Sequence, residues 1–503
     1  MHRSTRLAVV LWLALGALGL ALEAAGPAMA GADRFVVDIG NEPSSLDPQV
    51  QWNPDSYYVY RNVFDNLVTR DDAGKIVPEV ATSWRYLSDT EIEFTLRSDI
   101  VFHDGTKLTA DDVAFSVQRI TDPKFASPQL GQFNKIVEAK ATSPTAVVLR
   151  TDGPYPALLA QLVKLSIVPK HVVEAVGKDA FNQKPVGSGP YVFESWQRGI
   201  AVTLKRNDAY WGRKGPFATA VFKAVPDPAT RVADLEAGTA DLAITLDSDL
   251  AAQLKGSPRA KVLSVPTERV AYLRMNTAKP PFDKIEARRA FAAAIDRGGL
   301  VEGILGGYAK PLPEMLTPVH FGWVEGVRGP SYDLAKAKAL LASAGAREVI
   351  EFATSPAYDQ RIVQAVQQML NEAGFDVKIN MMDNATFLAR AQSGPATGPT
   401  TSFGRWSCAC QDADGVLFPL MHRSSGWSFY RNADADALLE DARATLDEKR
   451  RLDDYRKLHA IVAEDVPLLP LYQDVAIYGA AKPLEWRPTP NESLFLNRMS
   501  WKE

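Results

Sequence analysis

The residues best suited to chemistry lie in the segment GRWSCACQDADG, residues 404–415. This segment holds the only two cysteines of the chain, Cys408 and Cys410, beside Trp406 and the acid Asp412. Two neighbouring cysteines can form a disulfide, act as exchanging thiols, or bind a soft metal ion as thiolates. An aromatic ring with nearby acids can instead line a pocket for a ligand with an apolar or sugar-like body.

The spacing of the two cysteines leaves their bonding state open. Residues two apart on an extended strand lie about 6.6 Å from each other, near the upper limit for a disulfide. A bridge between Cys408 and Cys410 therefore needs local bending, while an oxidising compartment favours it over two free thiols. A metal bound by both thiolates and Asp412 is a third possibility, but no histidine lies near in sequence. We expect no metal site.

Side chains alternate between the two faces of an extended segment. On this basis Trp406, Cys408 and Asp412 share one face, and we take all three as candidates for ligand contact. Arg405 has the opposite parity, which favours a structural or solvent-facing role, although it stays among the candidate ligand-binding residues. The alternation weakens after Gln411, because DADG can form a turn.

The rest of the sequence contains no catalytic pattern. The histidines are scattered, and neither HExxH nor CxxC occurs. The stretch GSGPY, residues 187–191, lacks the third glycine of a dinucleotide-binding loop, and Ser188 is not in a GxSxG elbow. We therefore expect no enzymatic activity and no cofactor.

Composition narrows the class of protein. The chain has 503 residues, which predicts two or three domains rather than one core. Acidic and basic residues nearly balance, with a formal net charge of −4. This balance argues against a nucleic-acid partner, because nucleic-acid binding needs a basic face.

The first 30 residues have the pattern of a secretory signal peptide. A basic start, MHRSTR, precedes an apolar run and the small-residue sequence Ala28-Met29-Ala30. The apolar run is short for a membrane-spanning helix, which needs about 20 residues. We expect cleavage near Ala30 and export of the mature protein to the periplasm.

Strand and helix patterns alternate along the mature chain. Residues 91–96 predict a half-buried strand, and Thr109 with Asp112 forms a variant capping box that opens a helix through Ile120. Further helices are expected at 229–238, 332–345, 360–374 and around 452–462, with strands at 240–244 and 375–379. This interleaving predicts an α/β protein with mixed sheets.

Four long segments together carry a family resemblance. They are residues 41–49 (NEPSSLDPQ), 78–120 (PEVATSW to SVQRI), 185–212 (PVGSGPY to AYWG) and 272–297 (YLRMNT to AIDR). The chain closely resembles the family 5 extracellular solute-binding proteins, the peptide, nickel and glycoside receptors of ABC importers. The resemblance runs through essentially the whole mature chain.

The resemblance implies a type II periplasmic binding protein with a ligand cleft between two lobes and an extra domain on the first lobe. We expect the signal peptide at 1–30, lobe 1 at 31–270 with the extra subdomain at about 60–185, lobe 2 at 271–479, and a return to lobe 1 at 480–503. It also implies a monomer that closes on a small-molecule solute and delivers it to permease subunits in the inner membrane.

The resemblance also implies roles for single residues. Trp406 matches a tryptophan that meets the ligand in the family. Dipeptide-binding members hold the two charged ends of the peptide with an aspartate and an arginine, and the matching positions here are Ala409 and Ser355. This disfavours a dipeptide and leaves a longer peptide, an opine-like conjugate or an oligosaccharide open.

Three further residues are candidates for the pocket. Glu42 lies in an N-terminal segment that often approaches the ligand in the family, and Tyr272 and Arg274 lie on one side of the expected hinge strand. We therefore predict a transport receptor without chemistry. The alternative is a secreted thiol-dependent chaperone or hydrolase that uses Cys408 and Cys410.

Overall fold

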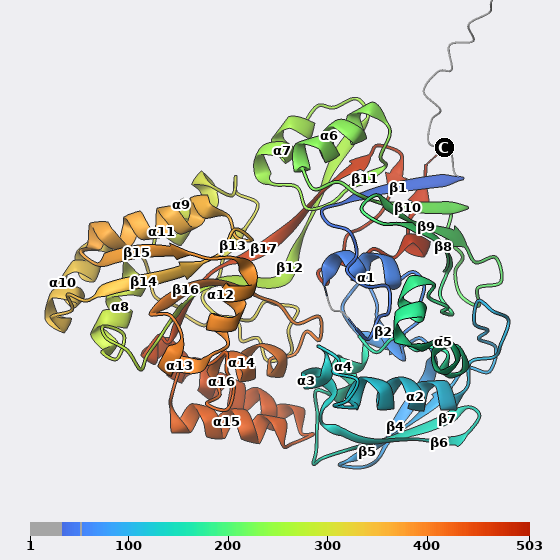
Figure 1. Ribbon diagram of the computed structural model, residues 1–503. Coiled ribbons are helices and arrows are strands. Elements are labelled where there is room, and N and C mark those ends of the chain that lie inside the picture. Colours follow the sequence, from blue (N-terminus) through green and yellow to red (C-terminus); the bar gives the residue numbers. More distant parts are fainter. Residues whose placement is uncertain (1–32, 51–52, 503) are drawn as a thin grey trace, which may run out of the picture.

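The computed structural model describes residues 33–50 and 53–502, so the expected signal peptide lies outside the described residues. Figure 1 shows two bodies joined by two long strands, β12 (Ala260–Met275) and β17 (Leu468–Ala481). We call the body that contains the chain's N-terminal strand lobe one and the other lobe two. None of the helices in the described part of the chain is long and apolar enough to cross a membrane.

One mixed sheet runs through both lobes. In lobe one, β17 is followed by β11 (Leu242–Ala243), β1 (Arg34–Ile39), β10 (Thr219–Ala224), β9 (Ala201–Arg206) and β8 (Tyr191–Gln197). In lobe two, β12 is followed by β16 (Thr401–Trp406), β14 (Val349–Thr354) and β15 (Asp376–Met381), and β13 (Lys310–Pro311) pairs with β17. The pairs β1–β10, β1–β11, β14–β15 and β14–β16 are parallel.

The long strands break their register where they pass between the lobes. They pair antiparallel from Ala260 opposite Ala481 to Arg274 opposite Leu468, with an irregularity between Pro266 and Val270. Proline has no N–H to donate to a ladder, so Pro266 suits this break. Side-chain bonds replace the missing ladder bonds: Thr267 Oγ1 donates to the Asp474 carbonyl over 3.0 Å, and Gln473 Nε2 donates to the Thr267 carbonyl over 2.7 Å.

Lobe one also carries a separate antiparallel sheet. Its order is β4 (Ala81–Ser88), β5 (Glu91–Leu96), β7 (Ala146–Thr151) and β6 (Ile136–Ser143), and α2 (Ala110–Thr121) packs on it. The predicted capping box is present, since the backbone N–H of Thr109 donates to Asp112 over 2.9 Å. The predicted strand 91–96 and this helix are confirmed.

Short elements complete lobe one. They are α1 (Pro54–Tyr60), β2 (Val68–Arg70), β3 (Ile76–Pro78), α3 (Leu130–Phe133), α4 (Leu158–Leu162), α5 (Lys170–Gln183), α6 (Pro228–Ala237) and α7 (Ser248–Leu254). After β17 the chain adds β18 (Leu484–Glu485), the 3-10 turn η1 (Leu496–Arg498) and β19 (Ser500–Trp501). This segment packs on lobe one, where the Asn62 side chain donates to the Leu494 carbonyl over 2.8 Å.

Helices cover the sheet of lobe two. They are α8 (Ile285–Ala293), α9 (Arg297–Gly303), α10 (Leu334–Ala344), α11 (Gln360–Ala373), α12 (Asn384–Ala391), α13 (Gly394–Thr397), α14 (Asp414–Met421), α15 (Ala433–Arg443) and α16 (Glu448–Asp465). The predicted helices near 332–345 and 360–374 are confirmed. Both end at a left-handed glycine, Gly345 with φ 61° and Gly374 with φ 104°, a backbone conformation that favours glycine.

Candidate ligand cleft

A cavity of about 230 Å³ lies where β12 and β17 pass between the lobes. β17 supplies Tyr472, Asp474, Val475, Ala476, Ile477 and Tyr478. Lobe one supplies Tyr58, Thr245, Leu246, Asp247 and Ser248, together with Glu492 from the returning C-terminal segment. Lobe two supplies Leu305, Tyr308, Ala309, Asp359, Arg361, Ile362, Phe403 and Arg405. A solute in this cavity would therefore touch both lobes.

A second cavity of about 50 Å³ adjoins the first, because Tyr58 and Glu492 line both. Its other walls are Asn53, Pro54, Tyr57, Glu268, Arg269, Ser407, Ala409 and Asn491. Glu268 and Arg269 come from the register break of β12, and Asp474 lies opposite the same break on β17. The break thus brings hinge side chains to the cleft.

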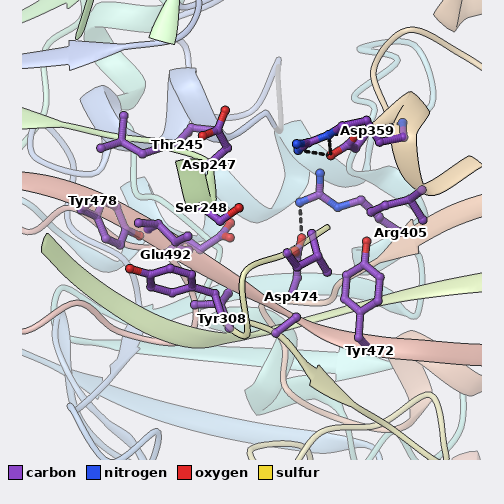
Figure 2. Close-up of a pocket in the computed structure, with 18 of the residues that line it drawn as sticks. Thr245, Asp247, Ser248, Tyr308, Asp359, Arg405, Tyr472, Asp474, Tyr478 and Glu492 are labelled. Atoms are coloured by element: carbon purple, nitrogen blue, oxygen red, sulfur yellow. Dashed lines mark hydrogen bonds and ion pairs between the residues drawn. The ribbon is translucent and has the colours of Figure 1, made fainter. Parts of the chain in front are cut away.

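Ion pairs connect the charged groups of the cleft. Arg405 bonds to Asp474, as Figure 2 shows beside Tyr472. Arg269 donates to Glu492 over 3.1 Å and lies 4.0 Å from Asp474. These pairs join lobe two, the hinge and the C-terminal segment through charge as well as packing.

Two helix N-termini contribute carboxylates to the cleft. Asp247 caps α7 by accepting from the backbone N–H of Leu250 over 2.8 Å, and Asp359 caps α11. Asp359 also accepts from Arg361, which in addition pairs with Asp249 of α7 over 3.2 Å. The Arg361–Asp249 pair links a helix of lobe two to a helix of lobe one.

The cleft contains strained backbone and a perturbed acid. Thr245 and Glu492 both have φ 56°, a left-handed conformation that is uncommon outside glycine. Such positions persist where the surrounding structure holds them, often at functional sites. Burial and the nearby charge of Glu492 raise the pKa of Glu268 to about 7, although Gln411 donates to Glu268 over 3.3 Å.

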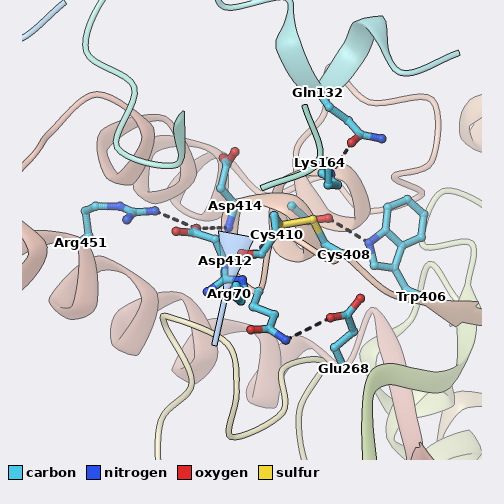
Figure 3. The surroundings of a disulfide bond; sticks show 12 residues. Arg70, Gln132, Lys164, Glu268, Trp406, Cys408, Cys410, Asp412, Asp414 and Arg451 are labelled. Carbon is cyan, nitrogen blue, oxygen red and sulfur yellow. Dashed lines mark hydrogen bonds and ion pairs between the residues drawn. A yellow bond between two sulfur atoms is a disulfide. The ribbon is translucent and has the colours of Figure 1, made fainter. Parts of the chain in front are cut away.

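The two cysteines form a disulfide, with their Cα atoms 4.9 Å apart (Figure 3). The prediction of an extended segment is wrong after Trp406, where β16 ends. Gln411 has φ 51°, and its N–H donates to the Cys408 carbonyl over 2.7 Å, so the chain turns. The turn sends the cysteines into the core of lobe two and leaves Ser407 and Ala409 facing the smaller cavity.

Asp412 is buried beside this turn rather than in the lining of either cavity. It accepts from Arg451 over 2.8 Å and from the backbone N–H of Asp414 over 2.9 Å. Because the chain no longer alternates faces here, the parity that grouped Asp412 with Trp406 does not apply. Trp406 itself donates to the Gly415 carbonyl over 3.0 Å and packs edge-on against Trp427.

The remaining predicted residues are divided between the lobes, with Glu42 in lobe one and Tyr272, Arg274 and Arg405 on paired strands of lobe two. Glu42 accepts from the Trp196 indole over 2.8 Å and lies 3.7 Å from Arg198 in lobe one. Tyr272 and Arg274 are buried on β12 within lobe two. Of the candidate residues, Arg405 lines the larger cavity. For all of them a role in binding the solute stays a prediction.

Arg274 already has partners within lobe two. Its guanidinium donates to the Ala391 carbonyl over 2.9 Å and the Trp427 carbonyl over 2.7 Å, and lies 3.7 Å from the centre of the Phe429 ring. These contacts tie together segments of lobe two. The guanidinium group of Arg274, a candidate partner for an anionic group of the solute, donates to backbone carbonyls of lobe two and lines neither cavity.

Sequence reasoning missed the cleft residues Arg269, Asp474 and Glu492. Pro266 inside a strand was a usable signal for the hinge break, since proline favours bulges and edges. Glu492 had no such signal. It reaches the cleft because the backbone N–H of Glu268 donates to the Pro490 carbonyl over 3.2 Å, a contact between segments more than two hundred residues apart.

Comparison with known proteins agrees with a two-lobed receptor. Residues 75–427 match the family model for bacterial extracellular solute-binding proteins, family 5, middle region. The chain belongs to this family. Its members bind small solutes without catalysing a reaction and deliver them to the permeases of ABC importers, so the protein is a solute-binding protein of an ABC importer.

Individual relatives cover nearly the whole chain. The probable D,D-dipeptide-binding periplasmic protein DdpA of Escherichia coli (strain K12) is 28% identical, over 93% of this chain and 94% of the relative. The glutathione-binding protein GsiB of Shigella boydii is 28% identical, over 93% and 94%. The structure of DppA from Helicobacter pylori in complex with the peptide STSA matches with a TM-score of 0.83 and 26% identity, over 93% and 98%. These relatives give no support to a thiol-dependent chaperone or hydrolase.

Proposed function

We propose that the mature chain is a periplasmic receptor that acts as a monomer, without enzymatic activity, and closes on a solute between its lobes. The observation that carries this is the cavity of about 230 Å³ with walls from lobe one, lobe two and the hinge strand β17. A solute that contacts both lobes binds the closed form more tightly than the open form, so it shifts the population toward closure. The permease then recognises the closed shape.

The proposed domain boundaries are those expected from the sequence. Residues 1–30 are a signal peptide cleaved near Ala30, and the mature chain is released into the periplasm. Residues 31–270 and 480–503 make up lobe 1, with the extra subdomain at about 60–185, and residues 271–479 make up lobe 2. The periplasmic location of the relative DdpA supports this proposal.

The proposed solute is peptide-like, with an opine-like conjugate or an oligosaccharide as the other classes. The dipeptide- and peptide-binding relatives favour the first class. Ala409 lines the smaller cavity and offers no charge there. Ser355 is buried, donates to Asn384 over 3.1 Å, and is absent from the lining of both cavities. A dipeptide gripped by charges at these two positions is therefore disfavoured.

Native mass spectrometry of the protein as purified tests the proposal. A denaturing spectrum of the same sample gives the mass of any retained solute by difference. We expect a bound solute whose mass fits a peptide, an opine or an oligosaccharide. A thermal-shift screen of the same three classes follows if the protein is purified empty. A receptor role is contradicted if no solute is retained and none of these compounds stabilises the protein.

A further inference from the structure

The cavity between the lobes has more acids than bases in its walls. Its lining includes four carboxylates and two guanidinium groups: Asp247, Asp359, Asp474 and Glu492 against Arg361 and Arg405. Two charged groups outside the lining of this larger cavity pair with these residues: Arg269, a wall of the smaller cavity, pairs with Glu492, and Asp249 pairs with Arg361. Counting both, five carboxylates face three guanidinium groups.

Each of these guanidinium groups already has a carboxylate partner. Arg269 pairs with Glu492 over 3.1 Å, Arg361 with Asp359 over 2.7 Å, and Arg405 with Asp474. Each guanidinium group keeps unused N–H donors, but its charge is already balanced, so an anionic solute would bring a second negative charge close to the carboxylate of the pair. A cationic solute meets carboxylates that can each accept about four hydrogen bonds and use only part of that capacity.

Other charges near the cleft leave this excess in place. Arg231 acts on Asp247 from behind, but the same guanidinium also faces Asp38, Asp227 and Asp55. Lys164 and Arg70 face Glu268 from lobe one. For that reason Glu268 is left out of the count.

Glu492 is the carboxylate best placed for a solute. Glu492 lines both cavities, so a solute group bound where the cavities meet would contact it, whichever cavity holds the rest of the solute. Its side chain is 20% exposed, and Arg269 donates to Oε2. Tyr58 also lines both cavities, and an aromatic face attracts cations.

We propose, on the basis of the receptor function proposed above, that the solute carries a positive charge. Its ammonium or guanidinium group lies at the junction of the two cavities, where Glu492 accepts hydrogen bonds from it. The remaining excess of carboxylates in the cleft selects against acidic solutes of the same size and shape. The receptor is thus specific for basic solutes, and Glu492 is a specificity-determining residue.

Matched tripeptides test this proposal. Alanine tripeptides with a central lysine, glutamine or glutamate are titrated by calorimetry into protein freed of bound solute by unfolding and refolding. The variants are Glu492→Gln, which removes the charge at nearly constant shape, and Glu485→Gln, the same change at an exposed position on β18. Circular dichroism verifies that both variants fold.

We expect the lysine peptide to bind at least about ten-fold more tightly than the glutamate peptide, as for a hydrogen bond between charged groups. Glu492→Gln should remove most of this preference and strengthen binding of the glutamate peptide, because Arg269 loses the nearer of its two carboxylate neighbours. Glu485→Gln should change neither. A preference for glutamate or no preference overturns the proposal, as does a folded Glu492→Gln protein with the preference intact.

The two proposals fail in different ways. One outcome is that the protein binds none of the peptides and still retains a solute from purification. A basic retained solute then supports the proposal of a positively charged solute, and an acidic or neutral one overturns that proposal. If the protein neither retains a solute nor binds one in the screen, the receptor function itself is contradicted.

Discussion

Glu314 shows what burial does to a single acid. Its side chain is 3% exposed in lobe two, and His459 Nε2 lies 3.1 Å from Oε2. Burial raises the pKa of Glu314 to about 8 and lowers the pKa of His459 to about 4. Both groups are therefore uncharged in the folded protein at neutral pH, and the protonated carboxyl group, like an amide, has a hydrogen-bond donor and an acceptor.

Glu314→Gln should stabilise the protein above pH 5. In the unfolded chain Glu314 ionises near its ordinary pKa of 4.5, whereas in the fold it stays protonated up to about pH 8. Folding stability is thus lost as pH rises from 4.5 to 8, by on the order of 3 kcal/mol at pH 7. Thermal denaturation from pH 4 to 8 should show a gain for the variant that grows with pH and vanishes near pH 4.

The exposed Glu325→Gln is the control for this prediction, because it makes the same change of side chain at a position in contact with water. A Glu314→Gln protein with the same denaturation temperature as the natural protein at every pH would contradict the prediction. So would a gain that is independent of pH.

The contacts of single residues could be predicted from the sequence where both partners are close together in the chain. The capping box of Thr109 and Asp112 was readable because its partners are three positions apart. Which side chains of residues 405–412 face the cleft could not be predicted, since the turn at Gln411 depends on the disulfide and on packing against lobe two. A correct family resemblance gave the fold without giving the orientation of these side chains.

At the scale of elements, the turn between β16 and α14 lies against the other lobe. Arg70 of β2 donates to the Cys410 carbonyl, and Gln411 donates to Glu268 of β12. The same turn presents Ser407 and Ala409 to the smaller cavity. The disulfide therefore fixes a segment that touches the lobe-one surface, the hinge and the cleft together.

Reducing the disulfide should weaken both stability and solute binding. Closing a loop of three residues contributes on the order of 1–2 kcal/mol in the chain-entropy model. We expect dithiothreitol to lower the denaturation temperature and to increase the rate of solute release. Thermal shift and dissociation kinetics with and without the reductant measure the two effects.

A protein with both Cys408→Ala and Cys410→Ala is the control, because it should not respond to the reductant. Equal responses of the natural protein and this variant would show that the effect does not come from the disulfide. Unchanged solute release after verified reduction would show that the turn does not depend on the bridge.

Elements were more predictable than their assembly. The helices at 334–344 and 360–373 followed from apolar periodicity and their glycine ends. The interleaved pattern gave the α/β class. The pairing of β11 with β17 and the register break between Pro266 and Val270 were not predictable, because they depend on segments far apart in the chain.

At the scale of the whole molecule, the exposed pair Arg361–Asp249 spans the lobes. Asp249→Asn should favour the open form. An exposed ion pair contributes about 0.2–1 kcal/mol, so we expect at most a roughly five-fold loss of solute affinity. Small-angle X-ray scattering of the solute-free protein should show a larger radius of gyration.

Asp376→Asn is the matched control, because Asp376 pairs with Lys378 over 2.9 Å within β15 of lobe two and links no second lobe. If both variants change affinity equally, the effect is a general loss of charge. An unchanged radius and affinity for Asp249→Asn would show that the inter-lobe pair does not hold the lobes together.

The pairing of β11 with β17 has a consequence for the order in which the parts of the protein can fold. The strands β12 to β17, which bound lobe two, come from one continuous stretch of chain, while the central sheet of lobe one needs β1 near the start and β17 near the end. Lobe one therefore cannot complete its sheet until almost the last residues of the chain are available. The cleft also needs Glu492 from the segment after β17, so a chain cut short before this residue lacks one of its walls.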